Sequence, residues 1–303
     1  MKLPTFLIFG VQKAGTTSIY SYLKEHPQIY MSPLKETNFL SKDSDNLSPE
    51  EWENHQFSSE KRAKIRNFEQ YCQLFTEADG EIAIGEASPN YLFHYETSIK
   101  NIRRFLPDVQ LIAILRDPAE RAYSDYLMHI RDNIPLKSKS FGTLIESHPQ
   151  SFIFRKGFYY TPLKQFFDAF SSDKIKIYLY DDLCEDALGL MQDMFEFVGV
   201  DRQFCPNVLR KEQVAEIPKS RVVNQILVEK NPLRTTVSLI LKSFLPVESR
   251  QRLRRRFIEW NSHSKSQSPL LIKYRQKLID MYHDDLLKLE DLIQRDLSGW
   301  LTI

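Results

Sequence analysis

The sequence predicts an α/β fold in which a central parallel sheet of about four to five strands has helices on both faces. Two apolar runs, residues 6–9 and 111–115, are each followed by a turn and then by a helical pattern. Two further runs, residues 82–85 and 175–180, have the length and composition of strands. Strands that alternate with helices are typical of parallel sheets, because parallel neighbours need a crossover connection.

The bulk composition indicates one large domain. We expect a single domain over residues 1–303, with a core at about 5–221 and a helical extension at about 222–303. Lysine and arginine total 41 against 40 acidic residues, a formal charge of +1, so the composition does not indicate nucleic-acid binding. Three widely spaced cysteines predict reduced thiols, and hence a cytoplasmic location. No apolar run predicts a transmembrane segment, and nothing indicates an oligomeric state.

The first strand leads into a glycine-rich loop that resembles a phosphate-binding loop. Gly10 and Gly15 have the Walker A spacing, but Thr16 stands where a nucleoside triphosphatase has its lysine, and Lys13 lies inside the loop. Loop amides and a helix N-terminus suit a phosphate or sulfate. The displaced lysine favours a donor with one phosphate-linked leaving group over a triphosphate. An ordinary turn, in which glycine and threonine serve only the backbone, explains the same residues equally well.

Three segments together resemble a known family. Residues 10–18 (Gly-Val-Gln-Lys-Ala-Gly-Thr-Thr-Ser), then His26 with Pro27, then residues 35–39 (Lys-Glu-Thr-Asn-Phe) are similar to the start of sulfotransferases that use 3′-phosphoadenosine 5′-phosphosulfate (PAPS). The similarity is to the heparan sulfate N- and 3-O-sulfotransferase type, in its bacterial branch. It implies a P-loop-like, three-layer domain and no metal ion. It also implies that the donor phosphosulfate is bound by Lys13, Ala14, Gly15, Thr16, Thr17 and Ser18.

The resemblance also implies a catalytic pair, Glu36 and Lys13. In the family, the glutamate of the segment that matches residues 35–39 is the proposed general base, and a carboxylate can accept the proton of an acceptor hydroxyl or amine. The alternative for Glu36 is a solvated ion pair with Lys35. Ala87 stands where the heparan sulfate enzymes have a lysine, so we expect Glu36 and Lys13 to do more of the catalysis.

Three polar side chains at the end of the strand at residues 82–85 have two interpretations. Glu86, Ser88 and Tyr91 follow this strand at the edge of the sheet where ligands bind in open parallel sheets. They either face the acceptor or belong to the turn and the core.

The second strand–turn–helix pattern predicts an anion-binding arginine. Arg116 ends an apolar strand, Asp117 is a natural N-cap, Pro118 suits the first helical position, and Ser124 lies about two turns further on. The resemblance implies that Arg116 and Ser124 bind the 3′-phosphate of PAPS, and an arginine fork suits phosphate. The alternative is an Arg/Asp pair that closes the turn.

Later segments add further candidates. The resemblance makes Tyr159, in a Gly-x-Tyr segment, either a site residue or a core residue. It also makes Lys219, Ser220 and Arg221 donor ligands in a loop over the phosphates, although a basic turn of this kind is common. The basic residues at 250–256 form either a solvated helix face or a surface for an anionic polymer.

The sequence therefore predicts an enzyme that moves the sulfuryl group of PAPS to a hydroxyl or amine. The expected acceptor is a saccharide, a glycolipid or a small alcohol, bound near the polar segments 41–59 and 133–150. Two alternatives stay open. One is a nucleotide or small-molecule kinase with a variant phosphate loop, which would consume ATP with Mg²⁺. The other is a non-catalytic protein that binds PAPS or a sulfated glycan through the basic residues at 250–256.

Overall fold

The computed structural model describes residues 2–42, 65, 67–132, 134–138, 140–208, 217–218, 262–263 and 269–303. Its main sheet has five parallel strands in the order β2-β3-β1-β4-β5, which confirms the predicted fold class. The strands are β1 (Phe6–Gly10), β2 (Ile29–Met31), β3 (Ala83–Ala87), β4 (Gln110–Leu115) and β5 (Ile175–Leu179). A short antiparallel pair joins β6 (Ile217–Pro218) to β7 (Ser262–His263).

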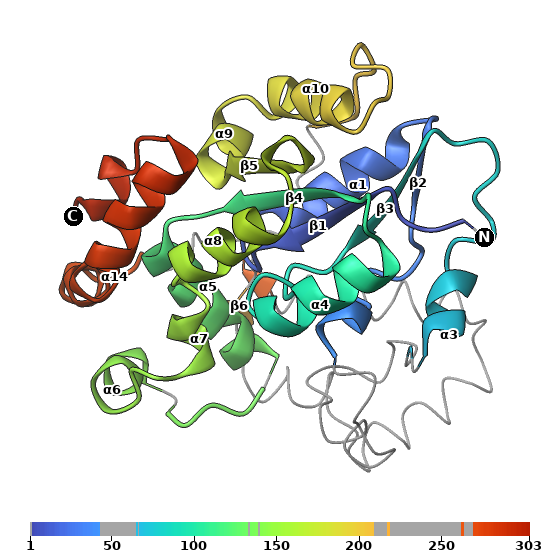
Figure 1. Cartoon of the computed structure of the whole chain (residues 1–303). Coiled ribbons are helices and arrows are strands. Elements are labelled where there is room, and N and C mark those ends of the chain that lie inside the picture. Colours follow the sequence, from blue (N-terminus) through green and yellow to red (C-terminus); the bar gives the residue numbers. More distant parts are fainter. Residues whose placement is uncertain are drawn as a thin grey trace, which may run out of the picture.

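Helices cover both faces of the sheet, as Figure 1 shows. On one side α1 (Thr16–Glu25) contacts α10 (Ala187–Phe197), and on the other α4 (Tyr95–Phe105) contacts α8 (Tyr160–Ala169). The other helices are α3 (Phe68–Gln73), α5 (Pro118–Arg131), α6 (Phe141–Ser147), α7 (Phe152–Arg155), α9 (Tyr180–Glu185) and α14 (Ile272–Ile293). Short 3₁₀ turns are η1 (Phe39–Ser41), η2 (Ser172–Lys174) and η3 (Ser298–Leu301).

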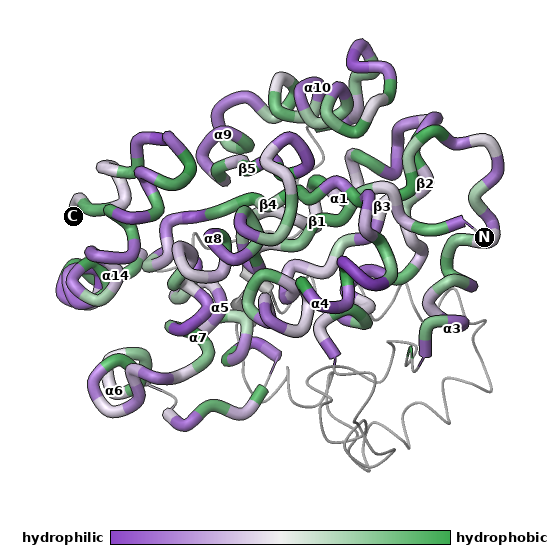
Figure 2. Tube along the Cα trace, in the orientation of Figure 1, coloured by the Kyte–Doolittle hydropathy of each residue, from purple (hydrophilic) through white to green (hydrophobic). Residues whose placement is uncertain are grey.

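The core lies along the central strands. All of β1 is buried, and β4 is buried from Leu111 onward. Hydrophobic residues follow these strands in Figure 2. The ring of Phe9 packs on Phe166 of α8, with 4.5 Å between ring centroids. Because both faces of a parallel sheet are covered, such strands are apolar throughout, which made β1 and β4 recognisable in the sequence.

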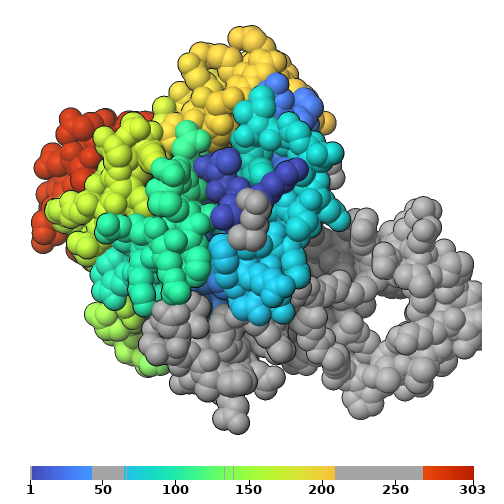
Figure 3. All heavy atoms as spheres, turned by 45° about the vertical axis from the view of Figure 1, so that its right-hand side comes forward, coloured from blue at the N-terminus to red at the C-terminus, as the bar shows by residue number. Residues whose placement is uncertain are grey.

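The N-terminal segment is tied to the sheet on both sides. The amide of Thr5 donates to the carbonyl of Ile84, and the carbonyl of Thr5 accepts from the amide of Gln110. Figure 3 shows this segment, in dark blue, between green and cyan parts of the chain.

The helices α6 and α9 lie in segments where the sequence patterns gave no helix. The polar segment 133–150 contains α6. The residues after β5 form α9, because the carboxylate of Asp182 accepts from the amide of Leu179 and so closes the first helical turn.

The C-terminal helix α14 packs on α5, α6 and α8. Arg275 of α14 donates to Asp117 at 2.8 Å. Asp285, also of α14, accepts from the amide of Tyr159 at 2.8 Å and that of Tyr160 at 3.2 Å, at the start of α8. No helix in the described part of the chain is both long and apolar enough to cross a membrane.

Candidate active site

The loop between β1 and α1 forms an anion cradle. Gly15 has a φ of +79°, and a Cβ placed there would lie 2.5 Å from Cδ2 of Leu183, so only glycine fits without a shift. Lys13 also has a left-handed backbone, with a φ of +72°. Thr16, Thr17 and Ser18 form the first turn of α1, whose leading amides have no partner inside the helix. Amides and a positive helix end therefore converge on one small volume.

Lys13 extends from the loop toward α5. Its Nζ lies 3.7 Å from Sδ of Met128. Burial lowers the pKa of Lys13, the charges of Arg131 and Arg116 lower it further, and Asp125 opposes them. A buried ammonium among other cations is stabilised by an anionic ligand. Ala14, the next residue of the loop, is fully buried.

Arg116 joins the two strand–loop–helix units. Its Nη1 donates to the carbonyl of Lys13 at 2.9 Å, and its guanidinium lies over the ring of Tyr180, with Cζ 4.7 Å from the centroid. The hydroxyl of Tyr159 donates to the carbonyl of Arg116 at 2.9 Å. Tyr159 is thus a buried core residue that contacts the site through the Arg116 backbone. Ser124 is nearly buried on α5.

An open cavity adjoins Arg116. Its volume is about 500 Å³, which falls in the range of small-molecule sites. Tyr180, Arg275 and Trp300 contribute to its lining, and so do the acidic residues Asp117, Glu120 and Asp181. A nucleoside-sized ligand therefore has room beside Arg116.

Glu36 lies beside the start of α1. Lys35 Nζ donates to Oγ1 of Thr17 at 3.0 Å and lies 3.4 Å from Oε1 of Glu36. The two charged side chains are only 20% and 18% exposed, so this pair is not the solvated surface pair that the sequence allowed. The amide of Glu36, whose φ is +59°, donates to the carbonyl of Ala87 at 2.8 Å.

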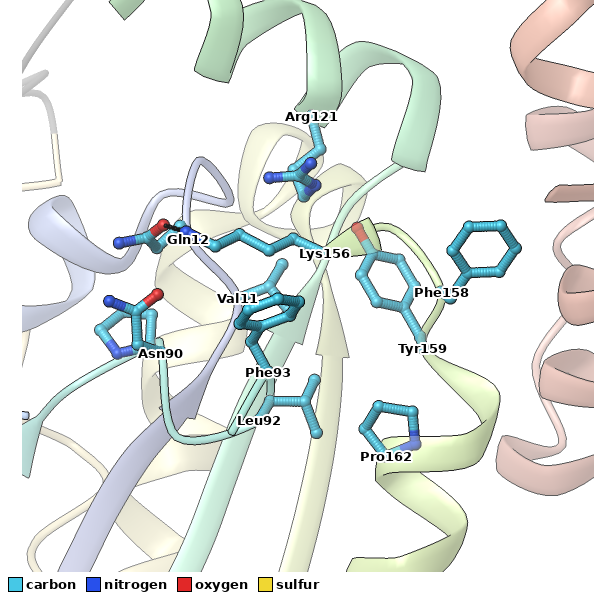
Figure 4. A pocket seen from close by; sticks show the side chains of 11 residues that line it. Val11, Gln12, Asn90, Leu92, Phe93, Arg121, Lys156, Phe158, Tyr159 and Pro162 are labelled. Atoms are coloured by element: carbon cyan, nitrogen blue, oxygen red, sulfur yellow. Dashed lines mark hydrogen bonds between the residues drawn. The ribbon is translucent and has the colours of Figure 1, made fainter. Parts of the chain in front are cut away.

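Lys156 is a residue of the site that no sequence motif indicated. Its Nζ donates to Oε1 of Gln12 in the glycine-rich loop at 2.6 Å, in a small pocket that also holds Phe93 and Arg121 (Figure 4). Burial lowers the pKa of Lys156, while the nearby carboxylates of Asp125 and Glu36 raise it. A basic residue immediately before the Gly-x-Tyr segment was the available signal.

The polar residues at the end of β3 and in the turn after it lie in the interior of the protein. Glu86, Ser88 and Tyr91 are fully buried, and Ser88 and Tyr91 donate hydrogen bonds to Glu86. They belong to the interior behind Glu36.

Other predicted residues lie outside the described part of the chain. They are Lys219, Ser220 and Arg221, the basic residues at 250–256 and most of the segment 41–59. Among the residues that are described, no three His, Cys, Asp or Glu side chains gather as a metal site requires.

Comparison with known proteins gives a consistent result. The model of the sulfotransferase family matches residues 4–203. The chain is 28% identical, over 211 residues, to human bifunctional heparan sulfate N-deacetylase/N-sulfotransferase 3, covering 66% of this chain and 22% of that protein. It is 33% identical, over 147 residues, to the membrane-associated sulfotransferase kil1 of Dictyostelium discoideum, covering 47% and 27%. The chain thus spans less than a third of the length of these relatives.

A solved structure covers the whole chain. The crystal structure of a sulfotransferase from Alicyclobacillus acidocaldarius superposes with a TM-score of 0.70 at 25% identity, and the match covers 100% of both chains. The fold, the loop that holds Lys13 and the match over residues 4–203 agree with the resemblance predicted from the sequence, and the chain belongs to the sulfotransferase family.

Proposed function

We propose that this protein transfers the sulfuryl group of PAPS to a hydroxyl or amine of a saccharide. One arrangement carries the proposal. Lys35 bridges a hydroxyl of the anion cradle, on Thr17, and the carboxylate of Glu36. A group bound in the cradle and a proton acceptor are therefore neighbours, as transfer to a nucleophile requires.

The donor would occupy the cradle and the adjoining cavity. Lys13, the amides at the start of α1 and the hydroxyls of Thr16 and Thr17 suit the 5′-phosphosulfate. Arg116 and Ser124 suit the 3′-phosphate, because an arginine fork matches phosphate oxygens. The cavity beside Arg116 is large enough for a nucleoside. The loop itself is closely packed, since a side chain at position 15 would meet the side chains of Leu183 and Tyr180.

The proposed reaction is a direct displacement at sulfur. A lone pair of the acceptor forms a bond to sulfur as the bond between sulfur and the bridging phosphate oxygen breaks. That electron pair leaves with 3′-phosphoadenosine 5′-phosphate (PAP). Glu36 takes the proton of the acceptor. Lys13 and the loop amides stabilise the charge that develops on the leaving phosphate.

The names of two relatives support a saccharide acceptor. One is a heparan sulfate N-deacetylase/N-sulfotransferase, and another, carbohydrate sulfotransferase 15 of the rat, is 30% identical over 169 residues. Both names specify sulfotransfer to carbohydrate. A hydroxyl and an amine of a saccharide would each lose a proton to Glu36 by the same chemistry.

A transfer assay with ³⁵S-labelled PAPS tests the proposal. Acceptors would be unsulfated and partly sulfated glycosaminoglycan oligosaccharides, with small phenols and alcohols for comparison. We expect label in the oligosaccharides, and a loss of about 10²- to 10⁴-fold in turnover for Glu36→Gln. Glu69→Gln, on the exposed side of α3, is the control and should retain full activity. Full turnover by the Glu36 variant would remove Glu36 from the role of base, and label only in the small alcohols would overturn the saccharide assignment.

A further inference from the structure

Glu86, at the end of β3, is a buried carboxyl group that the proposed mechanism does not use. Its Oε1 accepts from the hydroxyls of Ser88 and Thr37, the latter at 3.1 Å. Its Oε2 accepts from the hydroxyl of Tyr91 at 2.9 Å and from that of Tyr71 at 3.4 Å. Four hydroxyl groups thus surround one carboxyl group that has no exposed surface.

Three of these hydroxyls also hold one short backbone segment. The oxygens of Ser88, Thr37 and Tyr91 accept from the amides of residues 38, 39 and 40, in that order, at 3.0, 3.3 and 3.4 Å. A hydroxyl has one proton and two lone pairs. When each proton is directed at Glu86, the lone pairs are left for the amides. The hydroxyls of Thr37 and Tyr91 also lie 3.1 Å apart, but neither donates to the other when both donate to Glu86. The carboxylate therefore sets the orientation of three hydroxyls that hold three consecutive amides.

The segment held in this way begins two residues after Glu36. The amide of Glu36 is bonded to the carbonyl of Ala87, next to Glu86 in the chain. The side-chain amide of Asn38 donates to the carbonyl of Glu36 at 3.2 Å. The left-handed backbone at Glu36 is unusual for a residue with a side chain, so surrounding contacts must maintain it.

We propose that Glu86 is a positioning residue for Glu36: through Thr37, Ser88 and Tyr91 its carboxylate fixes residues 38–40, and with them the carboxylate of Glu36 beside the anion cradle. This inference rests on the proposed function, in which Glu36 accepts the proton of the acceptor. A displacement of about 1 Å in a reacting group can cost about 10²-fold in rate.

A carboxylate suits this role better than a neutral group of the same shape. A carboxylate only accepts hydrogen bonds, whereas an amide or a protonated carboxyl also donates one. An N–H or O–H donor at this position points at the oxygen of a neighbouring hydroxyl. That oxygen then uses for the new bond a lone pair that had held a backbone amide, and the amide loses its partner. Burial raises the pKa of Glu86, the surrounding hydroxyls partly offset that rise, and the resulting pKa is about 7. The titratable groups that face Glu86 are Tyr71 of α3 and Tyr91. Turnover should therefore fall as the pH drops below about 7.

The test is Glu86→Gln, which keeps the shape and replaces an acceptor by a donor. We expect kcat to fall about 10- to 100-fold while the Kd for PAP stays within about twofold. In hydrogen–deuterium exchange, the amides of residues 38–40 should exchange faster and those of β1 and β4 should not. Tyr71→Phe, measured at about pH 9 so that Glu86 stays ionised, is the matched control, because its hydroxyl bonds Glu86 but none of the three amides. Its kcat and exchange should match those of the wild type at the same pH.

A second variant keeps the inference testable if Glu86→Gln does not fold. Ser88→Ala removes one hydroxyl and should speed exchange at Asn38, with a smaller loss in kcat. Wild-type kcat and exchange in either folded variant would overturn the inference, as would equal losses in Tyr71→Phe. PAP binding and exchange are measured without an acceptor. If the wild type sulfates nothing, the proposed function fails, while exchange still decides whether Glu86 holds residues 38–40.

Discussion

Lys35 connects the two halves of the proposed chemistry. Its ammonium group touches a hydroxyl of the cradle on Thr17 and the carboxylate of Glu36. A cation in this place can offset negative charge on a transferred sulfuryl group and orient the carboxylate at the same time. Lys13, from the loop, and Lys35, from the acceptor side, therefore both lie near the proposed donor.

We predict that Lys35→Ala lowers turnover about 10- to 100-fold and weakens PAP binding only a few-fold, because the lysine acts mainly on the group in transfer. Transfer of ³⁵S and calorimetric titration with PAP measure the two effects. Lys24→Ala, an exposed lysine on α1, is the control. Unchanged turnover in the Lys35 variant would leave the bridge without a catalytic role.

At the residue scale, the sequence predicted those features that depend only on residues next to one another in the chain. Arg116 at a strand end, with Asp117 and Pro118 opening a helix, could be read from the sequence because the cap and the strand are contiguous with it. Lys156 contacts Gln12 across 144 positions, and Glu86 contacts Thr37 across 49. Such partners depend on how distant segments pack, which a single sequence does not indicate.

At the scale of elements, Gly15 shows how the cradle depends on two helices. Its left-handed backbone begins α1, and its missing side chain lets Leu183 of α9 approach. Gly199, after α10, has a similar φ of +81°, but no atom lies within 4 Å of the position that a Cβ would take there. A comparison of substitutions at the two glycines therefore distinguishes the cost of a positive φ from the cost of close packing.

We predict that Gly15→Ala and Gly199→Ala each lower the free energy of unfolding by about 1 kcal/mol through strain at positive φ. Gly15→Ala should cost about 1–3 kcal/mol more, because the new methyl group displaces Leu183. Only the Gly15 variant should lose PAP affinity. Urea unfolding and calorimetry check both effects, and equal behaviour of the two variants would contradict a packed cradle.

Elements with long apolar runs were predictable, and short ones were not. Strands β1 and β4 are continuous buried runs, whereas β2 has three residues, Ile29–Met31, and owes its place to pairing with β3. Helix α9 depends on the Asp182 contact with the amide of Leu179. That contact competes with a turn that the same acidic residues favour.

At the scale of the whole molecule, the strand order brings the site together. Strands β3, β1 and β4 are adjacent, and their carboxyl ends lead to Glu86, the Lys13 loop and Arg116. Helix α14 adds Arg275 beside Asp117 and Asp285 at the start of α8, so the C-terminal part of the chain supports the same edge. The predicted sheet and helical layers are confirmed by this arrangement.

The stability of the molecule should depend on pH through Glu86. Its pKa is about 7 in the fold, while an unfolded glutamate titrates at about 4.3. Between these values the folded state binds more protons, so the free energy of unfolding falls as pH rises, by about 4 kcal/mol, and levels off above about 7. Urea unfolding of the wild type and of Glu86→Gln is measured at about pH 5 and about pH 8. From the lower to the higher pH, the wild type should lose most of that amount of stability relative to the variant. A stability difference that is the same at both pH values would contradict the assignment.

Calorimetric titration with PAP tests the central claim, a PAPS site, most directly. ADP and AMP serve as ligand controls, each with and without Mg²⁺, and Arg202→Ala, an exposed arginine paired with Glu196, serves as the control for Arg116→Ala. We predict binding that needs the 3′-phosphate, is independent of Mg²⁺, is lost in Arg116→Ala and is kept in Arg202→Ala. Binding that requires Mg²⁺ and ADP, or equal affinity for PAP in both arginine variants, would contradict it.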